Sequence, residues 1–202
     1  MTNMDIQRII DTRIPDVAPV YGGVRGRTLS SRHNAYAWPA IIEAGVKMVI
    51  DLRDCDSSDK LPYICSNAGI GYFHYPVDNA AGCIDAMITL LPQFCETIDR
   101  GEFYIACAMG LHRTDIALCT YWIFYGADNG IAPPPIRGYR QEDGHNTNKI
   151  MRVLNAMYAR MTVQTRNNNQ ENTFFPLAIQ PSIILTKNAR IIIFRSSPQM
   201  TV

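Results

Sequence analysis

The sequence predicts an α/β fold in which a central, mainly parallel sheet is flanked by helices and followed by a C-terminal appendage. Short apolar segments rich in β-branched and aromatic residues alternate along the chain with longer segments of helical periodicity. Alternation of this kind is typical of layered α/β structures with parallel strands. The appendage is indicated by residues 166–172, a polar, asparagine-rich run that follows a change of composition near residue 162.

Three segments are predicted to form the strands of this sheet. Residues 47–53 (KMVIDLR) are apolar and β-branched and follow a glycine, as suits a buried strand. Residues 71–77 (GYFHYPV) are aromatic and alternating. Residues 103–106 (FYIA) form a short apolar run after an Arg-Gly turn, which indicates a third buried strand.

Four segments are predicted to form helices. The first covers residues 35–44 and is ended by a glycine. Residues 84–99 have helical spacing, and Pro92 either kinks this helix or begins a second one. Residues 114–125 (TDIALCTYWIFY) are almost wholly apolar, which predicts a buried helix. Residues 147–161 form an amphipathic helix, because their apolar side chains recur at spacings of three and four.

The chain is predicted to divide into one domain over residues 1–162 and a tail of unknown structure over residues 163–202. Its 202 residues suffice for one domain with a sizeable core and a small appendage. The tail contains one strand candidate, residues 189–194. An added hairpin, a partner-binding segment and a poorly ordered stretch remain open as alternatives for it.

Composition and charge exclude several classes of protein. Apolar residues make up 47% and charged residues 18% of the chain, as in soluble globular proteins. The net charge of +1 gives no field that would attract nucleic acid or a membrane surface. The sequence shows neither an apolar run long enough to cross a bilayer nor a secretory signal, so a cytoplasmic location is predicted, with non-standard secretion left open. The six cysteines include no CxxC pair, which argues against structural zinc and indicates reduced thiols.

The informative segment is 104–114 (YIACAMGLHRT), where a strand is followed by a cysteine, five loop residues, an arginine, a threonine and a buried helix. A loop that wraps into a helix N-terminus directs successive backbone N–H groups at one point, which makes an anion site. Gly110 permits the backbone conformation such a wrap needs, and Arg113 adds a permanently charged, bidentate donor. The residues predicted to bind phosphate are Ala108, Met109, Gly110, Leu111, His112 and Arg113.

The same positive field favours the thiolate form of Cys107, which makes this cysteine the predicted nucleophile toward phosphorus. Thr114 is expected to donate a hydrogen bond to the sulfur and to stabilise it again as a leaving group. The departing oxygen needs a proton donor. Asp78, which follows the strand of residues 71–77, is predicted to be that acid and then to activate the hydrolytic water.

The run from Cys107 to Thr114 matches the C-x5-R-[S/T] signature of protein tyrosine phosphatases. Residues 76–79 (PVDN) resemble the general-acid loop of the dual-specificity branch, and the VIDLR strand also resembles that branch, especially its small bacterial and atypical members. The resemblance covers roughly residues 15–162. It implies a dual-specificity-phosphatase-like fold, a phosphocysteine at Cys107, phosphate binding by Arg113, acid and then base catalysis by Asp78, and no metal or other cofactor.

Two positions depart from the pattern of that family. The family usually has histidine before the cysteine, where this chain has Ala106. The thiolate is therefore expected to be less favoured here. The family commonly has glycine after the serine or threonine, where this chain has Asp115. An acid suits the first turn of a helix, but its charge is expected to oppose phosphate binding slightly.

Other polar residues compete for roles at the site. Asp51 lies inside a predicted strand, and Asp54 and Asp56 lie in a polar loop, so these carboxylates are weaker candidates for the acid than Asp78. His112 in the loop either contacts the leaving group, or biases the choice of substrate, or is only a solvated neighbour. The proline-rich stretch after residue 126 is expected to border the site and to offer substrate contacts from Arg137, Arg140 or His145.

The function expected from these residues is hydrolysis of phosphate monoesters, with a phosphorylated protein or a small phosphorylated molecule as the partner. Phosphotyrosine is the leading substrate, with phosphoserine and phosphothreonine as alternatives if the cleft is shallow. Ala108, Met109 and Leu111 add no positive charge to the loop, which favours a less charged phosphomonoester. Phosphoinositides, inositol phosphates and RNA 5′-phosphates are alternatives, although no nucleic-acid or membrane binding is expected from the charge. A phosphate-binding pseudophosphatase is a further alternative, motivated by Ala106 and Asp115. The oligomeric state stays open.

Overall fold

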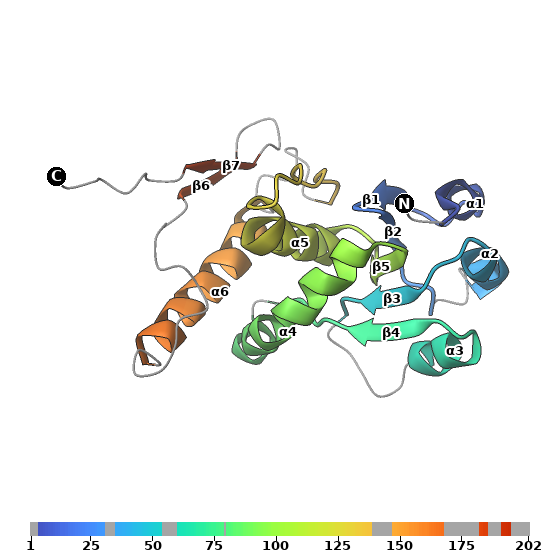
Figure 1. Cartoon of the computed structure of the whole chain (residues 1–202), viewed down its shortest axis with the longest axis horizontal. Helices are drawn as coiled ribbons and strands as arrows, with labels where there is room; N and C mark the ends of the chain where they lie inside the picture. Colours follow the sequence, from blue (N-terminus) through green and yellow to red (C-terminus); the bar gives the residue numbers. More distant parts are fainter. Residues whose placement is uncertain are drawn as a thin grey trace.

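The computed structural model describes residues 4–30, 35–53, 60–78, 80–138, 147–167, 182–185 and 191–194 of the chain (Figure 1). The central sheet consists of β1 (Ala18–Val20), β2 (Gly23–Arg27), β3 (Met48–Asp51), β4 (Gly71–His74) and β5 (Phe103–Cys107). These strands lie in the order β1-β2-β5-β3-β4. β2, β5, β3 and β4 are parallel to one another, and β1 pairs antiparallel with β2. The predicted mainly parallel sheet is confirmed.

Helices cover both faces of the sheet (Figure 1). One face packs against α1 (Ile6–Asp11), the 3-10 turn η1 (Ala35–Ala37), α2 (Trp38–Glu43) and α3 (Leu61–Asn67). The other face is covered by α4 (Ala81–Arg100) and α5 (His112–Tyr121), and α6 (Thr147–Asn167) packs against these two helices. The predicted α/β class, with helices on either side of the sheet, is therefore confirmed.

The central strand β5 is buried along its whole length, as is usual for parallel strands with helices on both faces. Its side chains alternate between the two cores. Phe103, Ile105 and Cys107 belong to the core under α4, α5 and α6, and Tyr104 and Ala106 belong to the core under α1, α2 and α3. The cysteine and the alanine before it consequently face opposite sides of the sheet.

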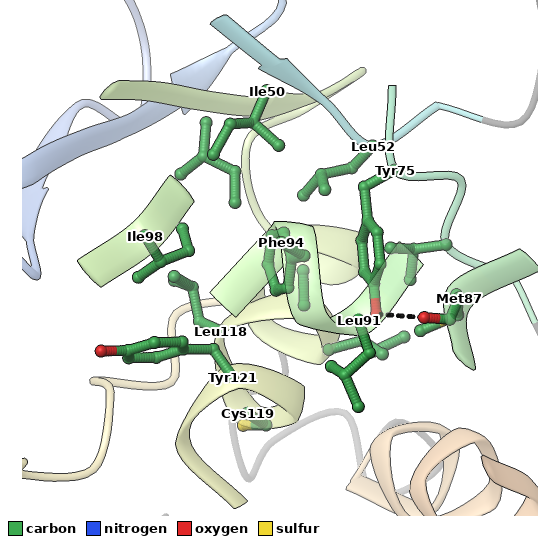
Figure 2. Close-up of a cluster of buried hydrophobic side chains, with 14 of the residues drawn as sticks. Ile50, Leu52, Tyr75, Met87, Leu91, Phe94, Ile98, Leu118, Cys119 and Tyr121 are labelled. Atoms are coloured by element: carbon green, nitrogen blue, oxygen red, sulfur yellow. Dashed lines mark hydrogen bonds between the residues drawn. The ribbon is translucent and has the colours of Figure 1, made fainter. Parts of the chain in front are cut away.

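Aromatic stacking fixes α4 against the sheet (Figure 2). The rings of Tyr75 and Phe94 lie parallel, with their centroids 4.0 Å apart. The buried Tyr75 hydroxyl donates a hydrogen bond of 3.2 Å to the Met87 carbonyl, so its polar atom is satisfied within the core. On the facing helix α5, Leu118 and Tyr121 complete the same cluster. This packing joins the second half of α5 to α4 and the sheet.

Several elements extend the sequence-based predictions. α4 is one helix of 20 residues with Pro92 inside it, so the alternative that Pro92 begins a second helix is wrong. The apolar helix predicted over residues 114–125 begins two residues earlier and changes at Trp122 into the π-helix η2 (Trp122–Gly126). The last helix, predicted to end at residue 161, continues to Asn167. None of the helices in the described part of the chain has the length and apolar character needed to cross a membrane.

The sequence predicts none of β1, β2, α1 and α3, which are short elements stabilised by their neighbours. In the tail, β6 (Ser182–Leu185) and β7 (Ile191–Phe194) pair antiparallel, with Ser182 opposite Phe194. β7 lies within the predicted strand of residues 189–194. The division of the chain at residue 162 stays a prediction, and this position falls inside α6.

Candidate active site

The predicted nucleophile lies where β5 ends and the chain turns into α5. Cys107 is the last residue of β5 and is 3% exposed, and α5 begins at His112. The Thr114 hydroxyl, in the first turn of α5, lies 3.5 Å from the Cys107 sulfur as hydrogen-bond donor. Thr114 is fully buried. The structure thus brings these two side chains together beneath the residues that connect β5 to α5, which we call the 107–113 loop.

The loop has the sharp backbone turn that the sequence predicts at Gly110. This glycine has a φ of 72°, in the left-handed region that other residues rarely adopt. A Cβ at this position would clash with the carbonyl group of Gly26 on β2 and lie 2.7 Å from the Arg27 nitrogen. The Gly110 amide donates to the Cys107 carbonyl over 3.3 Å and closes the turn. The loop therefore lies directly against β2.

The start of α5 offers backbone donors to an anion. Leu111 occupies the N-cap position, and its side chain makes no capping hydrogen bond. The first N–H groups of a helix have no acceptor within the helix, so they are available to a ligand or to water. The N–H of Asp115 is the first to be used inside the helix, since it donates to the Leu111 carbonyl over 2.9 Å.

The other loop residues differ in exposure. Ala108, Met109 and His112 are exposed, Leu111 and Arg113 are half-buried, and Gly110 is buried. Arg113 is the second residue of α5, so its main chain lies within the turn that carries the available donors. The exposed members form the rim of the loop.

A residue that the sequence-based reasoning missed, Arg25 of β2, holds the loop from the protein interior. Arg25 is fully buried, and one terminal nitrogen donates to the carbonyls of Gly110 (3.0 Å) and Leu111 (3.1 Å). The same nitrogen lies 2.7 Å from Asp115 Oδ1 in a fully buried ion pair. The segment GVRGR carried no clear strand signal, because its glycines and arginines are unfavourable in strands.

The ion pair bears on the expectation for Asp115. Its carboxylate is buried and faces the Arg25 guanidinium, so its negative charge is neutralised locally. Its second oxygen accepts hydrogen bonds from the amides of Arg137 (3.1 Å) and Gly138 (2.6 Å). The Asp115 carboxylate is therefore paired with a buried cation inside the protein, and its effect on phosphate binding stays a prediction.

The proline-rich stretch borders the loop, as the sequence predicts. A Cβ at Gly138 would lie 2.7 Å from the His112 nitrogen, so the 131–138 segment touches the start of α5. The Trp122 indole N–H donates to the Ile131 carbonyl over 2.7 Å and fixes the beginning of the segment. The Arg137 guanidinium donates to the Asp16 carbonyl over 3.4 Å. Two further predicted contact residues, Arg140 and His145, lie outside the described residues.

Asp78 lies at the same edge of the sheet as Cys107. After β4 the chain continues along β3, where the Val77 amide donates to the Leu52 carbonyl over 3.3 Å. The Leu52 amide in turn donates to the Ala106 carbonyl over 2.9 Å. The half-buried Asp78 follows directly, two strand positions away from β5. This placement suits a group that acts over the end of β5.

The rival carboxylate Asp51 is already engaged. It is 1% exposed, and its two oxygens accept from Arg53 Nε at 2.8 Å and Arg53 Nη2 at 2.6 Å. The Tyr72 hydroxyl donates a further bond of 3.1 Å to the same carboxylate. This carboxylate is therefore held inside the protein by Arg53 and Tyr72, which makes it a weaker candidate for the acid than Asp78. The other two rivals, Asp54 and Asp56, lie outside the described residues.

Two other buried thiols differ from Cys107 in their surroundings. Burial raises the pKa of Cys95 to about 12, with a smaller contribution from the Asp99 charge. Burial also raises the pKa of Cys119, and the Asp115 charge adds to the increase. These thiols are protonated at neutral pH and have no backbone donors of a helix N-terminus around them. Within the described part of the chain, no three His, Cys, Asp or Glu side chains are grouped so that they could hold a metal.

Comparison with known proteins gives matches in structure alone. No protein-family model matches the chain, and no curated protein matches it. A DUF442 protein of Shewanella putrefaciens CN-32, assigned as a phosphatase, aligns over 75% of this chain and 95% of its own, with 16% identity and a TM-score of 0.50. OH1 of Orf virus, a tyrosine phosphatase, aligns over 83% of this chain and 87% of its own, with 14% identity and a TM-score of 0.36. TpbA of P. aeruginosa aligns over 69% and 81%, with 12% identity and a TM-score of 0.41. The first of these likenesses extends over most of both chains, so this chain shares the fold of that Shewanella protein.

Proposed function

We propose that this protein hydrolyses phosphate monoesters through a phosphocysteine at Cys107. The observation that carries the proposal is the 3.5 Å contact between the Thr114 hydroxyl and the Cys107 sulfur beneath a glycine-turned loop. The sulfur therefore has a hydroxyl donor at its side, at the point where β5 ends and the chain turns into α5.

In the first step the Cys107 thiolate attacks phosphorus. The S–P bond forms while the P–O bond to the leaving group breaks, and Asp78 gives its proton to the departing oxygen. The Arg113 guanidinium and the amides of the loop, except that of Gly110, which donates to the Cys107 carbonyl, bind the other phosphate oxygens and stabilise their charge in the transition state. The products of this step are the free alcohol or phenol and the phosphocysteine.

In the second step water attacks the phosphocysteine. The Asp78 carboxylate accepts a proton from the water as its oxygen bonds to phosphorus, and the S–P bond breaks. Thr114 donates its hydrogen bond to the sulfur as the thiolate reforms. Inorganic phosphate leaves, and Asp78 is again protonated for the next cycle.

The rim of the loop favours a substrate with an apolar leaving group. Met109 is 44% exposed, and Ala108 beside it is also exposed. Neither carries a charge that would attract a second phosphate. We therefore place phosphotyrosine first, ahead of phosphoserine, phosphothreonine and multiply phosphorylated molecules.

The direct test is hydrolysis of p-nitrophenyl phosphate by the full chain. We expect turnover by the wild type and none above background for Cys107→Ser, because the alcohol is a far weaker nucleophile than the thiolate. Cys83→Ser, at a partly exposed thiol of α4, is the matched control and should retain wild-type activity. Equal activity of Cys107→Ser and wild type would exclude the proposal. Tight binding of phosphopeptides by an inactive wild type would favour the pseudophosphatase instead.

The acid is tested with leaving groups of different basicity. Asp78→Asn should slow hydrolysis of phenyl phosphate by about 100-fold or more and that of p-nitrophenyl phosphate much less, because nitrophenolate leaves without a proton. Asp85→Asn is the control, since Asp85 is a half-exposed carboxylate on α4 that faces Arg160 at 3.6 Å. An equal decrease for both substrates would remove Asp78 from the role of acid.

A further inference from the structure

We infer that the buried ion pair of Arg25 and Asp115 positions the 107–113 loop for phosphate binding, an inference that rests on the proposed function. Neither residue belongs to the C-x5-R-T motif, and Arg25 comes from a strand that the sequence does not predict. Both are positioning residues, because they contact the loop and not the substrate. Three observations support this role: the carbonyls that Arg25 binds, the unfavourable energetics of the pair, and its connection to the 131–138 segment.

The first observation concerns the direction of the loop amides. Arg25 donates to the carbonyls of Gly110 and Leu111 from inside the protein. In a planar trans peptide the C=O and N–H groups point in opposite directions. Fixing these two carbonyls toward Arg25 therefore turns the N–H groups of Leu111 and His112 away from it, toward the outer side of the loop. These amides are among the donors that would bind the phosphate oxygens.

The second observation is that stability alone gives little reason for this pair. Burying two charges has a large desolvation cost, and apolar replacements of buried pairs are often neutral or stabilising. Both side chains are fully buried, and the Nε of Arg25 has no hydrogen-bond partner among the described residues. An arrangement that leaves a buried donor unsatisfied is poorly optimised for stability. The Arg25 guanidinium instead donates hydrogen bonds to backbone carbonyls.

The third observation is that the pair joins the loop to the 131–138 segment. The second terminal nitrogen of Arg25 donates to the Pro135 carbonyl over 3.2 Å. Asp115 accepts from the amides of Arg137 and Gly138, and Gly138 touches the start of α5. One buried pair thus connects β2, the loop, α5 and the segment that borders the site. This arrangement explains why Asp115 is compatible with an anion site directly beside it.

The test uses a double variant in the full chain. Arg25→Met alone leaves the Asp115 charge buried without its partner, so a loss of function would be mixed with a loss of stability. Arg25→Met with Asp115→Asn removes both charges, while the asparagine oxygen can still accept from Arg137 and Gly138. We expect this double variant to recover most of the thermal stability that Arg25→Met loses. We also expect it to bind tungstate, used as a phosphate analogue, about 10- to 100-fold more weakly than the wild type.

Arg25→Lys is the second variant, and it keeps the inference testable if the double variant does not fold. Lysine keeps the positive charge that neutralises Asp115. Its single ammonium group replaces the planar guanidinium that donates to the Gly110 and Leu111 carbonyls. We expect near wild-type stability with tungstate binding and kcat/KM intermediate between the wild type and the double variant. A purely structural role would instead move stability and tungstate affinity together across the series.

The outcomes separate this inference from the proposed function. If the wild type turns over substrate and the double variant matches it in tungstate affinity and kcat/KM, the inference is wrong and the function stands. If the wild type binds tungstate without turnover, the function is wrong, and the tungstate affinities of the variants still decide the inference. If the wild type neither binds tungstate nor turns over substrate, both are wrong. Calorimetry, thermal unfolding and steady-state kinetics supply the three measurements.

Discussion

Two buried Arg–Asp pairs lie on either side of the central strand β5, and they are used differently. Asp51 and Arg53, on the β3 side, are two residues apart, and three donors of Arg53 reach the one carboxylate. Arg25 and Asp115, on the β2 side, come from elements far apart in the sequence. The Arg25 guanidinium also donates to backbone carbonyls of the loop and of the 131–138 segment. The first pair bonds to the side chains of Ser30 and Tyr72, and the second bonds to the backbone of the loop and of the 131–138 segment.

The difference shows that burial and ion pairing do not by themselves identify functional residues. Both pairs are buried, and both lie near the carboxyl edge of the sheet, next to the end of β5. The two pairs differ in the groups that accept from the arginine N–H donors not bound to the paired carboxylate. In the Asp51 pair Arg53 Nη1 donates to a side chain, the Ser30 hydroxyl, over 2.8 Å. The comparison predicts that changes on the β2 side alter anion binding and that changes on the β3 side alter mainly stability.

The largest effect is expected from Gly110→Ala, which disturbs the contact between the loop and β2. The new Cβ would clash with the Gly26 carbonyl, and the left-handed backbone would be strained. Strain and overpacking add, so we expect a loss of about 4 kcal/mol in unfolding free energy. We expect a fall of about 100-fold or more in kcat/KM, because small displacements of binding groups have large effects on rate. Denaturant unfolding and p-nitrophenyl phosphate kinetics measure the two quantities.

Gly130→Ala is the matched control for this change. Gly130 has the same φ of 72°, but a Cβ there would meet open space. The substitution should cost about 1 kcal/mol in unfolding free energy and leave kcat/KM unchanged. If the two alanine variants had the same kcat/KM, the contact between the loop and β2 would have no bearing on function.

The next effect is expected from Asp51→Asn on the β3 side. Removing this charge leaves the Arg53 guanidinium buried with an incomplete partner set, at a cost of about 3 kcal/mol in unfolding free energy. The tungstate affinity should stay within about threefold of the wild type, a change of well under 1.4 kcal/mol. Thermal unfolding and calorimetry on one preparation give both values. If Asp51→Asn reduced the tungstate affinity as much as the Arg25 variants do, the proposal that only the β2 side affects anion binding would be wrong.

The sequence predicts the parts of the fold whose residues carry a strong local pattern. β3, β4 and β5 are apolar or alternating runs, and α4, α5 and α6 have long helical periodicity, so their existence could be predicted. The loop could be recognised because its cysteine, glycine, arginine and threonine lie in one continuous motif. For the same reason Cys107 and Thr114 could be expected to meet.

The missing parts depend on contacts between distant segments. β2 forms because it pairs with β5 over Val24 to Arg27, and its own residues do not favour a strand. The role of Arg25 follows from that pairing, so no local signal could have indicated it. The π-helix at the end of α5 and the short helices α1 and α3 likewise lack a distinctive pattern. Asp115 could be identified in the sequence as a departure from the family pattern, but its partner, Arg25, could be found only in the structure.

The smallest effect is expected from Thr114→Val, which removes the hydroxyl beside the Cys107 sulfur. Valine keeps the volume and removes the donor that lies 3.5 Å from the Cys107 sulfur. Loss of one such hydrogen bond should lower kcat about tenfold. The hydroxyl matters most when the thiolate leaves, so breakdown of the phosphocysteine should become rate-limiting, with a smaller change in kcat/KM and a burst of p-nitrophenol before the steady state.

Thr120→Val provides a control within the same helix. Thr120 is also fully buried, but its hydroxyl donates to the Ile116 carbonyl over 2.9 Å, one turn back along α5. Its loss should change the unfolding free energy by about 1 kcal/mol and give neither a burst nor a lower kcat. If Thr114→Val showed parallel decreases in kcat and kcat/KM without a burst, the hydroxyl would not act on the leaving sulfur. The two threonines differ in what their hydroxyls contact, so a difference between the variants would assign the effect to the sulfur and not to burial.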